Sequence, residues 1–401
     1  MGRRAMLAMP WIAAGLALAL VALWLVSSER EREPARASLD VASLLGANSG
    51  EGFLRAEAPR EFEFPRDHAA HDGFKTEWWY FTGNLAAESG RRFGYQLTFF
   101  RSALAAKSPE RSSTFAADHV WMAHFALSDI DGKEFTSFER FARESGAIAG
   151  ANANPVSIWL KDWRCDFGPD GLPIHVAARE GELSIDFSLT SAKPPVLQGD
   201  RGLSQKTAGA GNASYYYSLT RLETSGAVGV DGATFEVSGF SWMDREWSSG
   251  ELGKERIGWD WFALQLDDGS ELMWYRLRHA DGSLDPFNSG SFVDAQGSSQ
   301  PLAASDVVLT ESATWTSPRS KAVYPARWRL QCPRLNLDLE LEPALADQEL
   351  GGAFRYWEGA VEVRGTRAGR GYVELVGYST ESGEFVRSRD GHLRAANAAR
   401  R

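Results

Sequence analysis

Short runs of apolar and aromatic residues, separated by turn-forming pairs, make up most of the chain. Residues 77–82 (Glu-Trp-Trp-Tyr-Phe-Thr) and 93–100 (Phe-Gly-Tyr-Gln-Leu-Thr-Phe-Phe) predict a β-hairpin. Asp-Gly pairs such as Asp231-Gly232 end other runs and supply the positive φ that tight β-turns need. Helical periodicity is confined to short pieces at 109–117 and 343–349. Many short strands with frequent turns predict an all-β protein built from barrels or sandwiches.

Alternation along residues 77–82 divides the side chains between two faces of the predicted strand. Glu77, Trp79 and Phe81 point to one face, and the intervening residues point to the other. One set lines a barrel interior, and the other packs outside the barrel or against a neighbouring domain. The sequence leaves open which set does which.

An apolar run over residues 5–26 follows two arginines at the N-terminus. About 20 apolar residues span a bilayer as a helix, whereas a cleaved signal peptide has a core of about 7–15. Pro10 and Gly15 interrupt the run, so residues 1–28 are expected to be a signal anchor or a cleaved signal peptide. Both place the rest of the chain outside the cytoplasm. We expect an exported, periplasmic or extracytoplasmic protein, anchored to the inner membrane by its N-terminal helix.

Composition excludes several classes of function. The net charge is −10 with no long basic run beyond the N-terminus, so nucleic acid is not an expected partner. The 15 Trp, 22 Phe and 10 Tyr favour β-sheet and require a large core or an aromatic-lined cavity. Cys165 and Cys332 are too few for a disulfide framework, and one bridge or two separate thiols both stay open.

Signatures of metal, phosphate and serine-hydrolase sites are missing from the sequence. The seven histidines show no metal-ligand spacing, and there is no nucleophile elbow and no phosphate-binding loop. We therefore expect no metal, no cofactor, and neither serine-hydrolase nor metallo-hydrolase chemistry.

A second aromatic hairpin echoes the first. Residues 78–101 and 259–278 each read as an aromatic strand, a turn and a strand that ends in arginine. The echo favours two copies of one architecture with a boundary near residue 250. The expected order is a flexible linker at 29–58, a first domain at 59–248, a second at 249–388 and a disordered tail at 389–401.

Four motifs follow one another along the exported part. They are residues 71–85 (His-Asp-Gly-Phe-Lys-Thr-Glu-Trp-Trp-Tyr-Phe-Thr-Gly-Asn-Leu), 241–247 (Ser-Trp-Met-Asp-Arg-Glu-Trp), 356–361 (Tyr-Trp-Glu-Gly-Ala-Val) and 371–378 (Gly-Tyr-Val-Glu-Leu-Val-Gly-Tyr). In this order they resemble the carotenoid hydratase-like, or AttH-like, family of lipocalin-like "predicted secreted hydrolases". The resemblance implies two tandem lipocalin-like (calycin-type) antiparallel β-barrel domains, with a ligand pocket associated with the barrels and their interface. It also implies ABC-transporter subunits as partners, because relatives are often encoded beside them.

The resemblance further implies hydration of a double bond, or cyclisation as in more distant relatives. Hydration needs a proton donor beside an apolar pocket whose aromatic faces stabilise a carbocation. Asp244 is the nearest candidate donor, with Arg245 beside it as a second catalytic candidate. The hydratases carry His where this chain has Arg245, and an Asp near positions 275–277, which this chain lacks. Both departures count against hydration of a carotenoid.

Seven further side chains are expected to contact a ligand: Glu77, Trp79, Tyr80, His124, Trp247, Trp261 and Tyr275. Each has a structural alternative. Residues 244–246 can form an ion-pair cluster that ties the domains together, and Glu77 needs a partner when buried, for which Arg245 is suited. His124 can be a hydrogen-bonded core histidine, and the aromatic side chains can be core.

Two functions remain after these considerations. The preferred one is a membrane-tethered protein that binds a hydrophobic small molecule, a lipid or isoprenoid, and works with an ABC transporter. The alternative is a carotenoid hydratase-like enzyme that acts on an isoprenoid or polyketide double bond by acid catalysis. The departures at Arg245 and at positions 275–277 favour binding, whereas Asp244 and Trp247 favour the enzyme.

Overall fold

The computed structural model describes residues 50–106, 117–250, 253 and 255–378, together with the backbone of β24 (Phe385–Arg387) and β25 (Leu393–Ala395). The expected N-terminal segment, most of the linker and most of the tail lie outside these residues. Among the residues described, no helix has the length and apolarity needed to cross a membrane.

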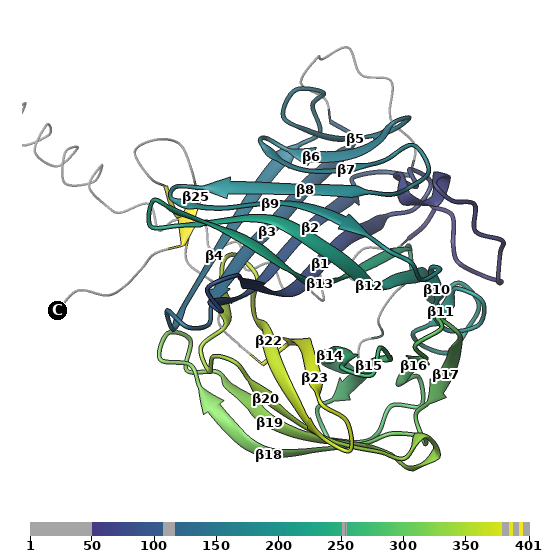
Figure 1. The fold of residues 1–401 in the computed structure, drawn as a ribbon. Helices are drawn as coiled ribbons and strands as arrows, with labels where there is room; N and C mark the ends of the chain where they lie inside the picture. The colour runs from purple at the N-terminus through teal and green to yellow at the C-terminus, as the bar shows by residue number, and fades with distance from the viewer. Residues whose placement is uncertain are drawn as a thin grey trace, which may run out of the picture. The chain divides into compact units, whose positions relative to one another are not determined.

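Two large antiparallel sheets contain almost all the strands (Figure 1). The first comprises β1 (Thr76–Ala87), β2 (Arg92–Ala103), β3 (His119–Asp129), β4 (Glu134–Arg143), β5 (Ala149–Ala153), β6 (Val156–Leu160), β7 (Trp163–Phe167), β8 (Ile174–Glu180), β9 (Leu183–Thr190), β10 (Val196–Leu197), β11 (Leu203–Gln205), β12 (Ala213–Val230) and β13 (Ala233–Ser248). The second comprises β14 (Arg256–Leu266), β15 (Glu271–His279), β16 (Ser289–Val293), β17 (Ser299–Ala303), β18 (Val308–Thr316), β19 (Val323–Cys332), β20 (Leu337–Pro343), β21 (Glu349–Gly351), β22 (Arg355–Gly365) and β23 (Gly369–Val376). One sheet is a nearly closed barrel and the other a half-barrel, which confirms the all-β, two-barrel prediction.

The two sheets have the same connectivity. In each sheet the first strand pairs with the second strand and with the last: β1 with β2 and β13, and β14 with β15 and β23. In each sheet the fourth and fifth strands along the chain do not pair, so they form the two ends of the strand order. These ends are β4 and β5 in the first sheet, and β17 and β18 in the second. The predicted hairpin is the β1–β2 pair, and its echo is the β14–β15 pair.

The segment 343–349 and the Asp-Gly turns differ in part from what the sequence predicts. No helix forms at 343–349, where β20 ends and β21 begins, because the segment passes from one strand to the next. The expected positive φ occurs at Asp231 (51°) and Gly232 (76°). In the turn after β3 it falls on Lys133 (58°) rather than on Gly132.

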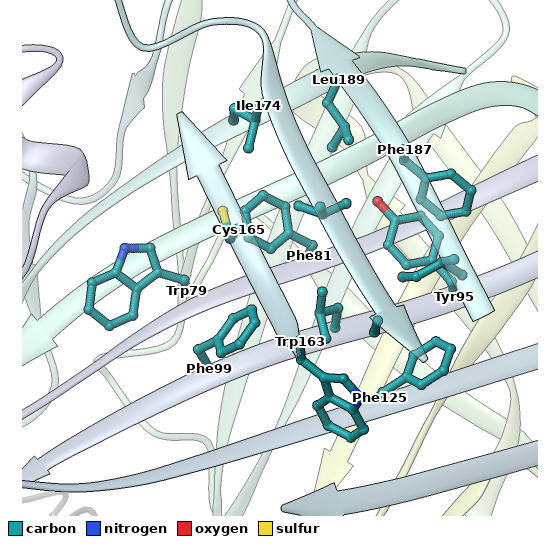
Figure 2. Packing of buried hydrophobic residues seen from close by; sticks show 14 of the residues in the cluster. Trp79, Phe81, Tyr95, Phe99, Phe125, Trp163, Cys165, Ile174, Phe187 and Leu189 are labelled. Atoms are coloured by element: carbon teal, nitrogen blue, oxygen red, sulfur yellow. The ribbon is translucent and has the colours of Figure 1, made fainter. Parts of the chain in front are cut away.

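The burial pattern of β1 shows which of its two faces lines the first barrel and which meets the second sheet. Trp79 and Phe81 lie in the core of the first barrel, packed with Phe99 and Trp163 (Figure 2). Tyr80 instead packs with Trp261 and Tyr372 of the second sheet, and Trp78 packs against the same cluster. One face of β1 therefore builds the first barrel, and the other faces the second sheet.

Both cysteines are buried free thiols, one in each core. Cys165 belongs to the hydrophobic cluster of the first barrel, and Cys332 belongs to that of the second. Of the two alternatives that the sequence left open, the structure has the separate thiols.

A buried ion-pair cluster joins three neighbouring strands of the first sheet, β2, β1 and β13. Glu77 on β1 is 1% exposed and pairs with Arg101 on β2 and Arg245 on β13. The backbone N–H of His71 donates to both Glu77 carboxylate oxygens at 3.1 Å. The Arg245 guanidinium also lies 3.8 Å from the centre of the Trp79 ring. Burial opposes ionisation of Glu77, but Arg245 and Arg101 outweigh it and hold its pKa well below the usual range.

Replacing Glu77 by Gln is expected to lower the free energy of unfolding by about 3–5 kcal/mol, because two buried arginines lose their counter-charge. Urea denaturation measures the loss. Glu88→Gln, an exposed change just after the same strand, serves as control and should cost less than about 0.5 kcal/mol. A loss of under 1 kcal/mol for Glu77→Gln would show that the cluster does not hold the strands together.

Candidate active site between the two sheets

A cavity of about 130 Å³ lies between the two sheets. Its walls are mainly aromatic: Trp78, Tyr80, Phe100, Tyr216, Trp259, Trp261, Tyr275 and Tyr356. Four ionisable groups and one histidine also line it: Lys206, Asp244, Glu246, Glu374 and His124. The cavity is thus an apolar space with a few charged or protonatable groups, which is the usual composition of small-molecule sites.

Alternation along β13 separates residues that the sequence grouped together. Asp244 and Glu246 line the cavity, whereas Arg245 and Trp247 point to the opposite face of the strand. Arg245 binds Glu77 there, the partner that the sequence suggested. The cluster expected for residues 244–246 therefore does not form as one unit.

The nine predicted site residues divide in the same way. Those that line the cavity are Tyr80, His124, Asp244, Trp261 and Tyr275, and those that do not are Glu77, Trp79, Arg245 and Trp247. All four of the latter lie on the other faces of β1 and β13, where they pack against or bind one another.

Asp244 is a buried carboxyl with a full set of donors. Its Oδ1 accepts hydrogen bonds from Ser218 Oγ at 2.6 Å and Trp242 Nε1 at 2.7 Å, and its Oδ2 accepts one from the Tyr216 hydroxyl. Trp261 Nε1 donates to that hydroxyl at 3.2 Å. Burial raises the pKa of Asp244 to about 7 even though these hydrogen bonds oppose the rise.

Glu374 faces the cavity from the second sheet. Trp259 Nε1 donates to its Oε1 at 2.6 Å, and within the described chain Oε2 has no hydrogen-bond partner. Burial raises the pKa of Glu374 to about 7, and the negative charges of Asp244 and Glu246 add to the rise. Ionisation of Asp244 therefore helps to keep the proton on Glu374.

The two carboxyls occupy corresponding positions in the two sheets. Asp244 lies on β13 directly opposite Tyr80 of β1, and Glu374 lies on β23 directly opposite Trp261 of β14. Tyr80 and Trp261 are also the matching residues of the echoed aromatic strands. Each carboxyl thus stands on the last strand of its sheet, beside the first.

Lys206 follows β11 and enters the cavity beside Glu246. Its Nζ lies 3.0 Å from Glu246 Oε1 and 4.5 Å from the centre of the Tyr275 ring. Burial alone would lower the pKa of Lys206, but Glu246 and Tyr275 outweigh that effect and raise it. Lys206 is therefore an ammonium group at neutral pH.

Two further groups lie at or behind the wall. Glu358 is fully buried, and neither carboxyl oxygen has a partner in ordinary hydrogen-bond geometry within the described chain. Burial raises the pKa of Glu358 well above its usual range, and the charge of Glu374 adds to the effect, so Glu358 is a neutral acid. His124 Nδ1 lies 2.6 Å from the Tyr356 hydroxyl and Nε2 lies 3.1 Å from Glu139 Oε2, so both of its ring nitrogens are hydrogen-bonded.

Several of these cavity residues cannot be recognised as site residues from the sequence alone. Glu374 and Glu358 lie within the matched motifs at 371–378 and 356–361, but the motifs alone do not show which face they occupy. Lys206 lies in the connection between β11 and β12, and no motif in the sequence marks it as a site residue. Within the described residues no group of three His, Cys, Asp or Glu side chains is arranged to hold a metal ion.

Residues 55–378 match the AttH-like family. The chain belongs to this family. An AttH from Nitrosomonas europaea is 37% identical over 80% of this chain and 99% of its own, with a TM-score of 0.72. Kievitone hydratase from Nectria haematococca shares the lipocalin-like fold at 14% identity, over 81% of this chain and 98% of its own, with a TM-score of 0.58. No curated protein matches the chain.

Glu358→Gln should change how stability depends on pH. The unfolded chain releases the Glu358 proton above about pH 4.5, whereas the folded protein keeps it, so wild-type stability falls as pH rises through this range. The glutamine variant lacks this loss. Its free energy of unfolding relative to wild type should increase from pH 5 to pH 8, by up to about 1.4 kcal/mol per pH unit. Urea denaturation at several pH values measures it, and exposed Glu340→Gln should show a constant difference.

Proposed function

We propose that this protein is an enzyme that adds water to a carbon–carbon double bond of an apolar small molecule, or removes it, by acid–base catalysis. The observation that carries the proposal is a pair of carboxyl groups at one aromatic-lined cavity, the buried Asp244 and the half-buried Glu374. Hydration places a proton on one carbon and hydroxide on the other, so it needs one acid and one base.

The surroundings of the two carboxyls favour different roles. Three hydrogen-bond donors stabilise the ionised form of Asp244, which suits it to take a proton from water. Among the described residues only Trp259 donates to Glu374, and the charges of Asp244 and Glu246 favour the protonated form of Glu374, which suits it to give a proton to carbon. This assignment gives the donor role to Glu374 rather than to Asp244, the donor suggested by the sequence.

The aromatic walls suit the same reaction. They keep bulk water away from the reacting bond and surround the apolar part of a bound molecule. Kievitone hydratase, which has this fold, is a hydratase by name. Membership of the AttH-like family, with a hydratase among proteins of this fold, is compatible with the proposed chemistry.

A binding protein is the second candidate, and the aromatic lining of the cavity favours it. A carrier of apolar molecules, however, gains nothing from buried carboxyl groups, whose burial costs free energy. A carrier therefore has no need of Asp244 and Glu374, which an enzyme would use as its base and acid. Membrane anchoring and cooperation with an ABC transporter stay predictions.

Glu374→Gln and Asp244→Asn should each lower the rate of hydration by about 100-fold or more, because each removes one proton-transfer group. The assay incubates the protein with a panel of isoprenoid, polyketide and unsaturated carbonyl compounds in H₂¹⁸O and follows ¹⁸O in the alcohol products by mass spectrometry. Glu340→Gln is the matched control on an exposed strand position. Unchanged affinity for a co-purifying molecule, with no turnover by any form of the protein, would instead establish a carrier.

The rate should also show a bell-shaped dependence on pH. Below about pH 7 the base Asp244 becomes protonated, and above about pH 7 the acid Glu374 loses its proton, so kcat/KM should peak near neutrality. Steady-state kinetics from pH 5 to pH 9 test this, with tryptophan fluorescence as a check on folding. A flat profile over this range would exclude these two carboxyls as the acid and base.

A further inference from the structure

We propose that the substrate's double bond is conjugated to a carbonyl group, and that Lys206 donates a hydrogen bond to the carbonyl oxygen. The inference rests on the proposed function and names its substrate class. It assigns Lys206 as the residue that distinguishes conjugated carbonyl compounds from isolated alkenes.

Lys206 is the one cationic side chain among the described residues that line the cavity. Its side chain is only 15% exposed, and its Nζ lies 3.0 Å from Glu246 and 5.3 Å from the centre of the Tyr216 ring. An ammonium group has three N–H donors. In the described chain Glu246 is the one acceptor within reach of these donors, so two of them are available to a bound molecule.

This geometry suits an apolar molecule that carries an oxygen acceptor. The aromatic rings around Lys206, from Tyr216 on the first sheet and Tyr275 on the second, leave an apolar space for the rest of the molecule. A carbonyl oxygen can accept a hydrogen bond without bringing a second charge to bury. An unfunctionalised hydrocarbon would leave the ammonium donors unpaired in a desolvated site, which is costly.

The available acids point to the same substrate class. Protonation of an isolated double bond forms a carbocation directly and requires a strong acid. Glu374 and Asp244, whose pKa values are both about 7, are weak acids. When the bond is conjugated to a carbonyl group, the electrons move to oxygen instead, and a cation beside that oxygen stabilises the developing negative charge.

The oxygen of water forms a bond to the β-carbon while Asp244 takes one water proton, and the π electrons move to the carbonyl oxygen, giving an enolate held by Lys206. The enolate re-forms the carbonyl group as its α-carbon takes the proton of Glu374. The product is a β-hydroxy carbonyl compound. Transfer of the proton from Asp244 back to Glu374 resets the site.

Lys206 acts here as a hydrogen-bond donor and not as a nucleophile. Although burial opposes its protonation, Glu246 and Tyr275 raise its pKa, so the free amine that an imine would need is scarce. The simpler role for Lys206 is to neutralise Glu246 with no contact to substrate. The double variant Lys206→Met/Glu246→Gln removes both charges together and therefore separates the two roles.

The test uses 4-dimethylaminobenzylideneacetone, a coloured conjugated ketone, and the matching 4-dimethylaminostyrene, which lacks the carbonyl group. Wild-type full-length protein should bind the ketone with a red-shifted absorption band. Lys206→Met and the double variant should lose the shift and bind the ketone about 10- to 100-fold more weakly, with no change for the styrene. Lys206→Arg should retain part of the shift, and exposed Lys133→Met should match wild type.

The proposal is overturned if the double variant keeps wild-type affinity and absorption for the ketone, or if wild-type protein binds neither probe. Binding and absorption do not depend on turnover, so failure of the proposed function is seen separately. If the red shift depends on Lys206 but no compound is hydrated, Lys206 is a carbonyl-binding residue of a carrier. If Lys206→Met hydrates isolated alkenes at the wild-type rate, the proposed hydratase activity is upheld and the proposed substrate class is wrong.

Discussion

The ion pair between Arg245 and Glu77 is buried in the first barrel, and the carboxylate of Glu77 offsets the free-energy cost of burying the Arg245 guanidinium. The pair fixes which face of β13 turns inward. Because neighbouring residues on a strand face opposite ways, the same pairing sends Asp244 and Glu246 towards the second sheet. Packing of Arg245 on Trp79 adds to this constraint from the adjacent strand. The cavity-lining face of β13 is thus set by a contact on its opposite face, which does not reach the cavity.

The chemistry of the cavity depends on groups from both sheets. Asp244 affects the protonation of Glu374 only because the sheets bring them to one desolvated space. Hydrogen bonds also cross between the sheets, such as the one from Trp261 to the Tyr216 hydroxyl that in turn binds Asp244. Neither sheet alone contributes Asp244, Glu374 and Lys206 to the cavity. A ligand pocket inside one barrel, as in a simple lipocalin, would have none of this coupling.

Periodicity and turn chemistry in the sequence predict the strands and the repeat, because these follow from local alternation and from Asp-Gly turns. The two barrels follow from the resemblance to the family. The site is harder to predict. Alternation shows that Glu77 and Trp79 share a face that Tyr80 does not, but only the packing of the second sheet shows which face meets a cavity. Adjacent positions in the sequence were also expected to share one site, but Asp244 faces the cavity and Arg245 faces the opposite side of β13. Lys206 and Glu374 come from distant segments and enter the site through tertiary pairing alone.

The matching positions of Asp244 and Glu374 have a consequence for the symmetry of the site. Each stands on the last strand of its sheet, opposite corresponding residues of the first strand. Because the two sheets share one connectivity, their backbones place one carboxyl group on each side of the cavity in equivalent positions. The side chains break this equivalence, since among the described residues Asp244 accepts hydrogen bonds from three donors and Glu374 accepts one from a tryptophan. A pseudo-symmetric backbone thus holds an asymmetric pair of carboxyl groups.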